Sequence, residues 1–254
     1  MMTHPLLPKL RQLRLSGMLY TLDLRAEQAR QENLSPLEFF ALLLDDELER
    51  RDQQRLSCRM KISGCNPQKT LSLFDFTAAP GVNRSFITDL ASCAFITRHE
   101  NILICGPTGV GKTHLANALG VEALKRNLHV LSKPVFRLVS DLNMARANGS
   151  YHRHLATILN CDLLIIDDFG LQSLTPVLIQ DLYEIICERY EKGSIVVTSN
   201  RAFEEWADVF GNDLLAGAAL DRLTHHAHTL VIQGESFRQI SRRKETLDKA
   251  KSIP

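Results

Sequence analysis

The chain of 254 residues carries a formal net charge of +1, 44% hydrophobic residues and a mean hydropathy of −0.09. This balance is typical of a globular protein and excludes a uniformly basic nucleic-acid binder, so any DNA-binding surface has to be local. No apolar run approaches the ~20 residues of a membrane span, and the first residues lack the apolar segment of a signal peptide, so we expect a cytoplasmic protein without membrane contact.

Residues 1–60 carry apolar side chains at helical spacing and no catalytic pattern. We expect a first short helix that stops near Ser16-Gly17 and a second helix directly after it. The clearest helix start is Ser35-Pro36-Leu37-Glu38, because Ser35 can cap the helix, Pro36 suits the first helical position and Glu38 closes a capping box. From there, one face of the helix is lined by Leu37, Phe40, Leu44 and Leu48.

The far end of this helix, residues 47–61, is dense in both charge signs, and Glu47 and Arg51 are spaced for an ion pair. Two interpretations stay open: a solvated helix face, or a surface that contacts DNA phosphates or a partner. The basic residues concerned are Arg50, Arg51, Arg55, Arg59 and Lys61. Breaks at residues 63–67 and 79–81 follow. We therefore expect a helical N-terminal domain over residues 1–68, which binds DNA or a partner, and a catalytic domain over residues 69–254.

The central motif of the chain is a phosphate-binding loop of the form G-x-x-x-x-G-K-T. It consists of Gly106, Pro107, Thr108, Gly109, Val110, Gly111, Lys112 and Thr113, and His114 follows it. Glycines let several backbone N–H groups point at one phosphate chain, Lys112 would reach the β- and γ-phosphates, and the Thr113 hydroxyl would bind Mg²⁺. An apolar strand at 101–105 precedes the loop and a helical pattern over about 113–126 follows it, which is the required order.

A strand at 129–132 and a helix opened by Pro134 are expected next, followed by a turn at 148–150. The residues around this turn are basic or imidazole-bearing: Arg146, His152, Arg153 and His154. They form either an exposed basic loop or a loop that contacts DNA.

A second chemical element is the run of residues 162–168, in which four apolar residues end in Asp167 and Asp168. Burying carboxylates without partners is costly, and a divalent cation supplies such a partner. We assign Asp167 to Mg²⁺, and Asp168 to orienting or deprotonating the attacking water.

The strand expected over residues 194–200 ends in Asn200, which is placed to hydrogen-bond the γ-phosphate or the lytic water, or serves as an ordinary turn residue. A helix over 214–226 and a last strand over 229–232 complete the pattern. His225, His226 and His228 lie at their junction without an acid at ligand spacing, so we expect them to be structural or solvated. The order of these motifs fits an ATPase better than a nucleotide kinase, because no insertion for an acceptor pocket and lid is evident.

Five segments in this order resemble the IstB-like helper ATPases of insertion sequences, which belong to the AAA+ class and are related to the DnaC helicase loaders. The segments are residues 106–114, 162–170, 198–200, 219–223 and 234–238. Residues 15–18 of the helical N-terminus are also similar to that family, so the resemblance runs over nearly the whole chain.

The resemblance implies an α/β fold: a P-loop NTPase (AAA+-like) parallel sheet flanked by helices, with a small all-helical N-terminal domain. It implies ATP and Mg²⁺ as cofactors, ATP sites shared between subunits of a homo-oligomer, duplex DNA as a substrate and a DDE-type transposase as partner. By motif match, Arg222 would be an arginine finger acting in trans and Arg238 a γ-phosphate sensor in cis; both could also be surface or ion-pair arginines.

Two features of the sequence depart from the general AAA+ pattern. Asp168 stands where Glu is usual, so slow or assembly-dependent hydrolysis would follow. The tail after Ile232 leaves little room for a helical lid. Two other functions compete with the transposition helper: a DnaC-like replicative helicase loader, and a nucleotide switch that does not hydrolyse ATP.

Overall fold

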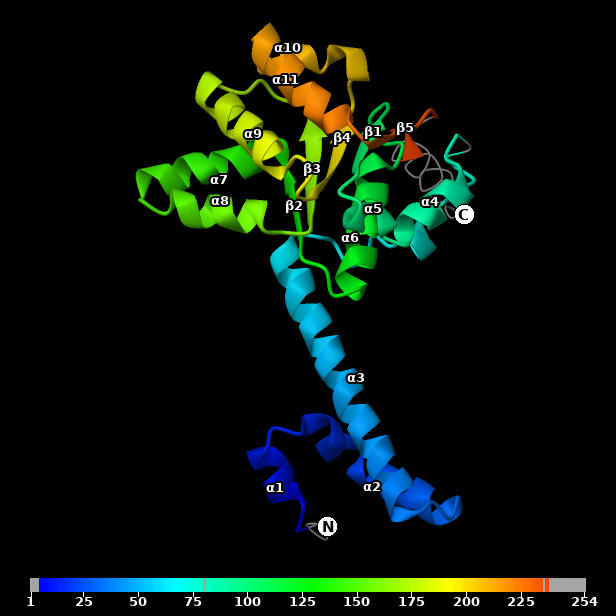
Figure 1. Ribbon diagram of the computed structural model, residues 1–254. Coiled ribbons are helices and arrows are strands. Elements are labelled where there is room, and N and C mark those ends of the chain that lie inside the picture. The colour runs from blue at the N-terminus through cyan, green and yellow to red at the C-terminus, as the bar shows by residue number, and fades with distance from the viewer. Residues whose placement is uncertain (1–4, 80, 235, 238–254) are drawn as a thin grey trace, which may run out of the picture. The chain divides into compact units, whose positions relative to one another are not determined.

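The computed structural model describes residues 5–79, 81–234, 236 and 237, and the chain divides between Arg59 and Met60 into two compact units (Figure 1). We expected the division after residue 68. The structure places it earlier because the residues that follow the third helix belong to the second unit: Cys65 is buried there, and the Asn66 N–H donates to Asn117 Oδ1 (2.9 Å).

The N-terminal unit is helical, with α1 (Leu7–Gln12), α2 (Ser16–Gln31) and the first part of α3 (Pro36–Ser63). Its small core contains Met18, Leu22 and Leu43. The expected capping box at the start of α3 is present, since the Ser35 N–H donates to Glu38 Oε2 (2.8 Å) and the Glu38 N–H donates to Ser35 Oγ (3.3 Å).

Gly17 lies inside α2, so the expectation that a helix stops there was wrong. Its role is close helix packing: a Cβ at Gly17 would lie 2.5 Å from Glu47 Cα on α3. The Gly17 N–H donates to Glu47 Oε2 (2.6 Å), and Arg51 Nε donates to Glu47 Oε1 (2.7 Å), which confirms the expected ion pair. Burial alone would raise the pKa of Glu47, but the bonds from Arg51 and Gly17 lower it overall.

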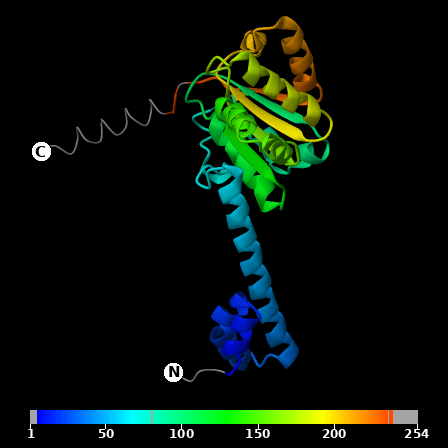
Figure 2. The ribbon, with the colours of Figure 1, turned by 90° about the vertical axis from the view of Figure 1, so that its left-hand side faces the viewer.

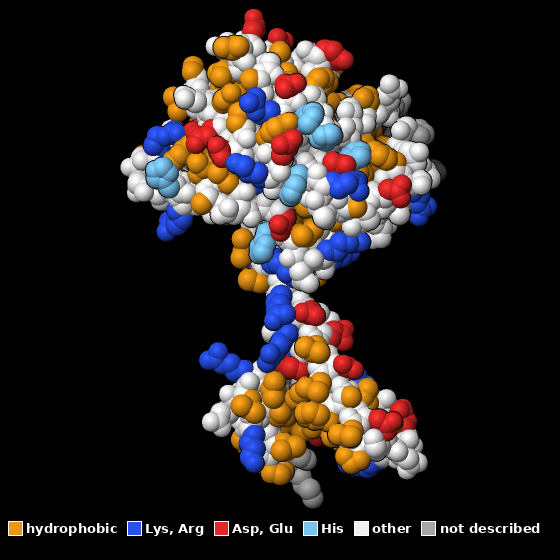
Figure 3. All heavy atoms as spheres, in the orientation of Figure 1, with side chains coloured by type: hydrophobic (Ala, Val, Ile, Leu, Met, Phe, Trp, Pro, Cys, Tyr) orange, Lys and Arg blue, Asp and Glu red, His pale blue; other side chains and the backbone are white. Residues whose placement is uncertain are grey.

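An apolar stripe on α3 stays exposed and is distinct from the face that packs on α2. Leu37, Phe40, Leu44 and Leu48 are 80%, 53%, 41% and 60% exposed, although their spacing is that of a buried helix face. Figure 3 shows hydrophobic side chains gathered on the visible face of this unit. Exposed apolar area of this kind marks an interaction surface.

The second unit is built on a five-stranded parallel sheet with the order β2-β3-β4-β1-β5 (Figures 1 and 2). The strands are β1 (Asn101–Cys105), β2 (Val130–Pro134), β3 (Leu163–Phe169), β4 (Ser194–Ser199) and β5 (Ala227–Val231). Because all pairs are parallel, the loops that follow β1, β3 and β4 meet at one edge of the sheet. This edge is where an open α/β sheet places its ligand.

Helices cover both faces of the sheet, as the two ribbon views show (Figures 1 and 2). Alternate residues of each strand serve opposite faces: Leu103 and Leu164 join the core beneath α7, α8, α9 and α11, whereas Ile165 faces α6, where a Cβ at Gly120 would meet it. The helices are α4 (Arg84–Ala91), α5 (Ala94–Thr97), α6 (Lys112–Lys125), α7 (Val135–Ala147), α8 (Tyr151–Leu159), α9 (Pro176–Arg189), α10 (Ala207–Phe210) and α11 (Asp213–Thr224), with 3-10 turns η1 (Leu71–Leu73) and η2 (Phe203–Glu205).

The residues expected in a basic loop around position 149 belong to the helices α7 and α8, which flank a short turn. Arg146 belongs to α7, and its guanidinium pairs with buried Asp181 (2.5 Å) and lies over the Tyr151 ring (4.4 Å). The sequence pattern missed α8, where two buried side chains, Leu155 and Ile158, share a face of a helix only nine residues long. Among the helices of the described ranges, none has the length and apolarity to cross a membrane.

Candidate functional site

The phosphate loop connects β1 to α6 at the carboxyl edge of the sheet. Gly106 has φ +148°, and a Cβ there would lie 2.2 Å from the Ile232 carbonyl oxygen, so a side chain has no room. Gly111 has φ +100° and is the N-cap of α6, which directs the first N–H groups of that helix at the loop. This geometry is an anion cradle at a helix N-terminus.

Lys112 lies within the loop and is 8% exposed. Its Nζ donates to the carbonyl oxygens of Gly106 and Pro107, both at 2.7 Å. Backbone carbonyls of the phosphate loop therefore hold the ammonium group inside the loop.

Two hydroxyl groups converge on the carboxylate of Asp167 at the end of β3. Thr113 Oγ1 donates to Asp167 Oδ1 at 2.9 Å, and Thr198 Oγ1 at the end of β4 donates to the same oxygen. Thr198 Oγ1 also accepts from the Asp168 N–H (3.2 Å). A hydroxyl of the loop, an acid of β3 and a hydroxyl of β4 thus form one cluster.

A β-bulge separates the two acids. In the β3–β4 pairing Ile166 lies opposite Val197 and Phe169 opposite Ser199, so Asp167 and Asp168 together face the single residue Thr198. Asp168 has φ +56°, in the left-handed region that few residues other than glycine adopt. In a regular strand the two side chains would point to opposite faces; the bulge instead brings both to one cavity.

That cavity has a volume of about 420 Å³ and joins the loop to the acids. Its lining contains the loop from Thr108 to Thr113 together with Asp167, Asp168 and Asn200, so the structure brings these sequence-predicted residues together. The same lining includes the apolar side chains of Leu73, Phe74, Ala78, Ala79 and Phe237. Gly106 and Pro107 lie behind the cradle, where their carbonyls hold Lys112.

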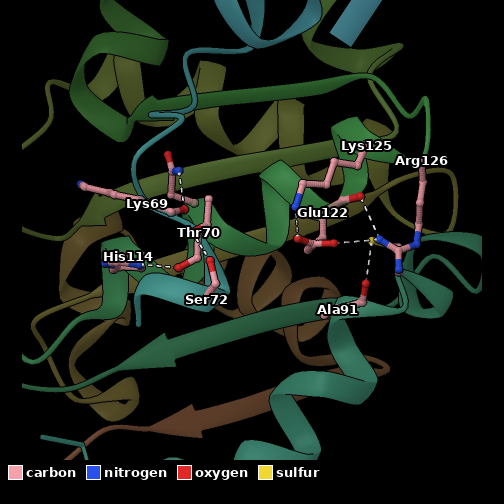
Figure 4. A network of polar contacts seen from close by, with 10 residues as sticks. Lys69, Thr70, Ser72, Ala91, His114, Glu122, Lys125 and Arg126 are labelled. Atoms are coloured by element: carbon pink, nitrogen blue, oxygen red, sulfur yellow. Dashed lines mark hydrogen bonds and ion pairs between the residues drawn. The ribbon is translucent and has the colours of Figure 1, made fainter. Parts of the chain in front are cut away.

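His114 also lines this cavity, but its Nε2 lies 2.8 Å from the Thr70 carbonyl oxygen (Figure 4). The sequence pattern did not identify Thr198 or Phe74. Thr198 could have been predicted, because it is a hydroxyl residue near the carboxyl end of a buried strand. Phe74 lies in an irregular segment far upstream of the loop, and only the fold brings it there.

Arg222 lies away from its own phosphate loop. Its backbone oxygen accepts from Asn101 Nδ2 (3.5 Å) at the start of β1, whereas the loop follows the end of β1. The side chain lines a separate cavity of about 200 Å³ with Arg98 and Tyr190, and its Nη1 donates to Ala218 O (2.7 Å). Arg238 lies outside the described residues.

The histidines near the end of α11 have protein partners. His228 Nε2 lies 2.8 Å from Glu100 Oε2, and His225 Nδ1 lies 2.9 Å from Tyr190 Oη. Within residues 5–79, 81–234, 236 and 237, no group of three or more His, Cys, Asp or Glu side chains is placed to hold a metal.

Comparison with known protein families gives a match to the model described as IstB-like ATP binding protein over residues 8–245. The chain belongs to the IstB-like ATP-binding protein family. An ATP-binding protein of insertion sequence IS21 from Pseudomonas aeruginosa is 39% identical over 95% of this chain and 91% of its own length. An ATP-binding protein of insertion sequence IS5376 from Geobacillus stearothermophilus is 38% identical over 84% of this chain and 85% of its own length.

Solved structures agree with the fold of this IstB-like protein. The AMPPCP-bound DnaA structure from Aquifex aeolicus has a TM-score of 0.58 at 22% identity, covering 73% of this chain and 56% of that chain. The crystal structure of the DnaC helicase loader has a TM-score of 0.50 at 23% identity, covering 58% of this chain and 86% of that chain. The expected AAA+-like P-loop fold, with a parallel sheet flanked by helices, is therefore confirmed.

Proposed function

We propose that this IstB-like protein is an Mg²⁺-dependent ATPase that binds duplex DNA and acts as a helper of insertion-sequence transposition. One observation carries the ATPase: the phosphate loop, Asp167 and Asp168 line a single cavity. The names of the relatives associate the family with ATP and with insertion sequences.

The donor set fits Mg²⁺. This cation prefers oxygen ligands and keeps several waters, and Thr113 Oγ1 and Asp167 Oδ1 are 2.9 Å apart at the foot of the cradle. These two residues would hold the ion, Thr113 directly and Asp167 through water. When bound, Mg²⁺ would neutralise charge that develops on the phosphates.

The remaining groups have separate tasks. Lys112 would exchange its two carbonyl partners for phosphate oxygens, and the N–H groups at the start of α6 would bind the same chain. Asp168 would orient the attacking water and accept its proton, and Asn200 would hydrogen-bond the water or the γ-phosphate. The apolar side chains of the lining, among them Phe74 and Phe237, would contact the base and ribose.

Duplex DNA and a DDE-type transposase are the proposed partners. Of the basic α3 residues for which DNA contact was one of two open interpretations, Arg51 and Arg55 pair with acids on α3, and Arg50 donates to Ser16 Oγ (2.6 Å). The pair of Arg55 with Asp52 is exposed and therefore weak, so Arg55 is able to exchange partners, whereas Arg51 is held by the buried Glu47 carboxylate. We assign the exposed stripe of Leu37, Phe40, Leu44 and Leu48 to the transposase, because water-exposed apolar area favours a protein partner.

The test is phosphate release from ATP, titrated with duplex DNA and with protein concentration, for wild type and Lys112→Ala. We expect Mg²⁺-dependent turnover in wild type that responds to DNA. In Lys112→Ala we expect loss of nucleotide binding, because the variant lacks the cation of the loop. Nucleotide affinity in Lys112→Ala equal to wild type would contradict the assignment of the site.

A wild-type protein that binds ATP but releases no phosphate under any of these conditions would instead support the non-hydrolysing switch. The transposition role is tested separately by binding to the transposase encoded alongside. Capture of a replicative helicase but not of this transposase would favour the helicase loader, for which the present support is a likeness of fold.

A further inference from the structure

The segment of residues 64–76, here called the strap, runs along the phosphate-loop helix α6 in the second unit. Apart from the short turn η1, it has no regular secondary structure. An irregular segment has few backbone bonds of its own, so side chains elsewhere have to fix it. Its far end carries Phe74, which lines the nucleotide cavity.

Four residues of α6 and its N-cap contact the strap at a regular spacing of three. A Cβ at Gly111 would lie 2.8 Å from Phe74 Cε2, and one at Gly120 would lie 2.9 Å from Cys65 Sγ. Between them come His114 and Asn117. Residues three apart are neighbours on a helix, so these four positions form a continuous row, which winds obliquely around α6 and against which the strap lies.

Asn117 fixes the first half of the strap with both ends of its amide. Its Oδ1 accepts from the Asn66 N–H (2.9 Å), and its Nδ2 donates to the carbonyl oxygens of Asn66 (2.9 Å) and Lys69 (3.3 Å). Asn117 is buried, so losing either partner would leave an unsatisfied polar group, which costs more than one ordinary hydrogen bond.

His114 fixes the second half. Its Nε2 lies 2.8 Å from the Thr70 carbonyl oxygen, as Figure 4 shows, and a carbonyl only accepts, so Nε2 carries the proton. The imidazole also meets the Phe74 ring edge-on, with 5.4 Å between centroids. His114 thus contacts both the backbone of the strap and the aromatic ring that the strap presents to the cavity.

We propose that His114 and Asn117 are positioning residues, which hold the strap so that Phe74 forms the wall for the nucleotide base. His114 acts through Thr70 and Phe74 rather than on the phosphates. The proposal rests on the proposed function, because it requires ATP in this cavity. The affinity for ATP then has two contributions: the loop residues bind the triphosphate, and the strap binds the base.

The experiment compares the dissociation constants of ATP and of inorganic tripolyphosphate, both with Mg²⁺, by calorimetry. The proteins are wild type, His114→Ala, His114→Gln and Phe74→Ala, with the exposed His152→Ala as a control for the type of substitution. In His114→Ala we expect ATP to bind about tenfold more weakly and tripolyphosphate to bind within about twofold of wild type. Phe74→Ala should show the same selectivity. His114→Gln, whose Nε2 is also a donor, should recover much of the ATP affinity.

Equal weakening of both ligands in His114→Ala would overturn the proposal and make His114 a phosphate ligand. Unchanged ATP affinity in Phe74→Ala would also overturn it, and this variant does not depend on whether His114→Ala folds, since Phe74 is only half-buried. Wild type that binds tripolyphosphate as tightly as ATP would overturn this inference alone. Wild type that binds neither ligand would overturn the proposed function as well.

Discussion

Two neighbouring acids, Asp167 and Asp168, differ sharply in their surroundings. Asp167 accepts hydrogen bonds from Thr113 and Thr198, whereas Asp168 follows in a left-handed backbone conformation and its side chain is exposed. A carboxylate held by two hydroxyls suits a fixed role at a cation, and an exposed one in the lining of the cavity suits contact with water.

At the residue scale we therefore expect Asp168→Asn to bind ATP as wild type does and to lose at least about a hundredfold in turnover, because an amide does not accept a proton from water. Asp167→Asn should instead raise the Mg²⁺ concentration needed for half-maximal activity. Nucleotide titration and steady-state phosphate release measure both. Wild-type turnover in Asp168→Asn would move the water-orienting role to Asp167 or Asn200.

Glu100 provides a prediction on pH and stability. Hydrogen bonds from Arg98, together with His228, lower its pKa from 4.5 to about 2, although burial opposes the shift. A carboxyl whose pKa is lower in the folded state stabilises the protein above pH 4.5, and this contribution is lost as the pH falls toward 2.

Glu100→Gln should therefore cost roughly 1–3 kcal/mol of unfolding free energy at pH 7, a smaller amount near pH 3 and little below about pH 2. Denaturant unfolding of both proteins across this range measures the difference. A gap between the two that stays constant with pH would show that Glu100 contributes through packing and not through its charge.

At the element scale, the close packing of α2 on α3 depends on Gly17, which has no side chain. A Cβ at Gly17 would lie 2.5 Å from Glu47 Cα and 2.6 Å from the Asp46 carbonyl oxygen, and both atoms are backbone. Neither can move without a shift of the whole helix. The same approach permits the Gly17 N–H to bond the buried Glu47 carboxylate.

Gly17→Ala should destabilise the N-terminal unit by about 1–3 kcal/mol, the usual range for overpacking. The matched control is Gly217→Ala in α11, where a Cβ would meet nothing within 4 Å, and alanine there should stabilise by about 0.5–1 kcal/mol. Thermal unfolding followed by circular dichroism measures both. Stabilisation in both variants would show that the two helices separate readily.

At the scale of the whole molecule, the site is incomplete in one subunit if Arg222 is an arginine finger. Arg222 lies near the start of β1, and the subunit's own phosphate loop follows its end. A γ-phosphate within its reach would therefore belong to a neighbouring subunit. An arginine supplied in trans changes turnover by about 10³–10⁵-fold.

Hydrolysis should then rise more than linearly with protein concentration. Arg222→Ala should bind ATP normally and hydrolyse it poorly, and mixing it with Lys112→Ala should restore activity, because an intact Arg222 can face an intact Lys112. The measurement is phosphate release by the mixture after hetero-assembly has been verified by cross-linking. A verified mixture no more active than its components would assign Arg222 to a structural role.

The local sequence by itself determined the phosphate loop, the strands before and after it, and the capping box at Ser35, because each depends on residue types at short fixed spacing. It also indicated that Asp167 and Asp168 follow a buried strand. Each of these features is determined by residues close together in the sequence, where steric and hydrogen-bonding rules act directly.

Only the tertiary structure decided how distant residues meet. The bulge that brings Asp168 to the side of Asp167 arises from pairing with β4, the strap lies on α6 through His114 and Asn117, and Gly17 serves a neighbouring helix. Arg222 is separated from its own loop because parallel strands place their two ends at opposite edges of the sheet. Each of these contacts joins segments far apart in the chain, so its geometry depends on packing that no local pattern records.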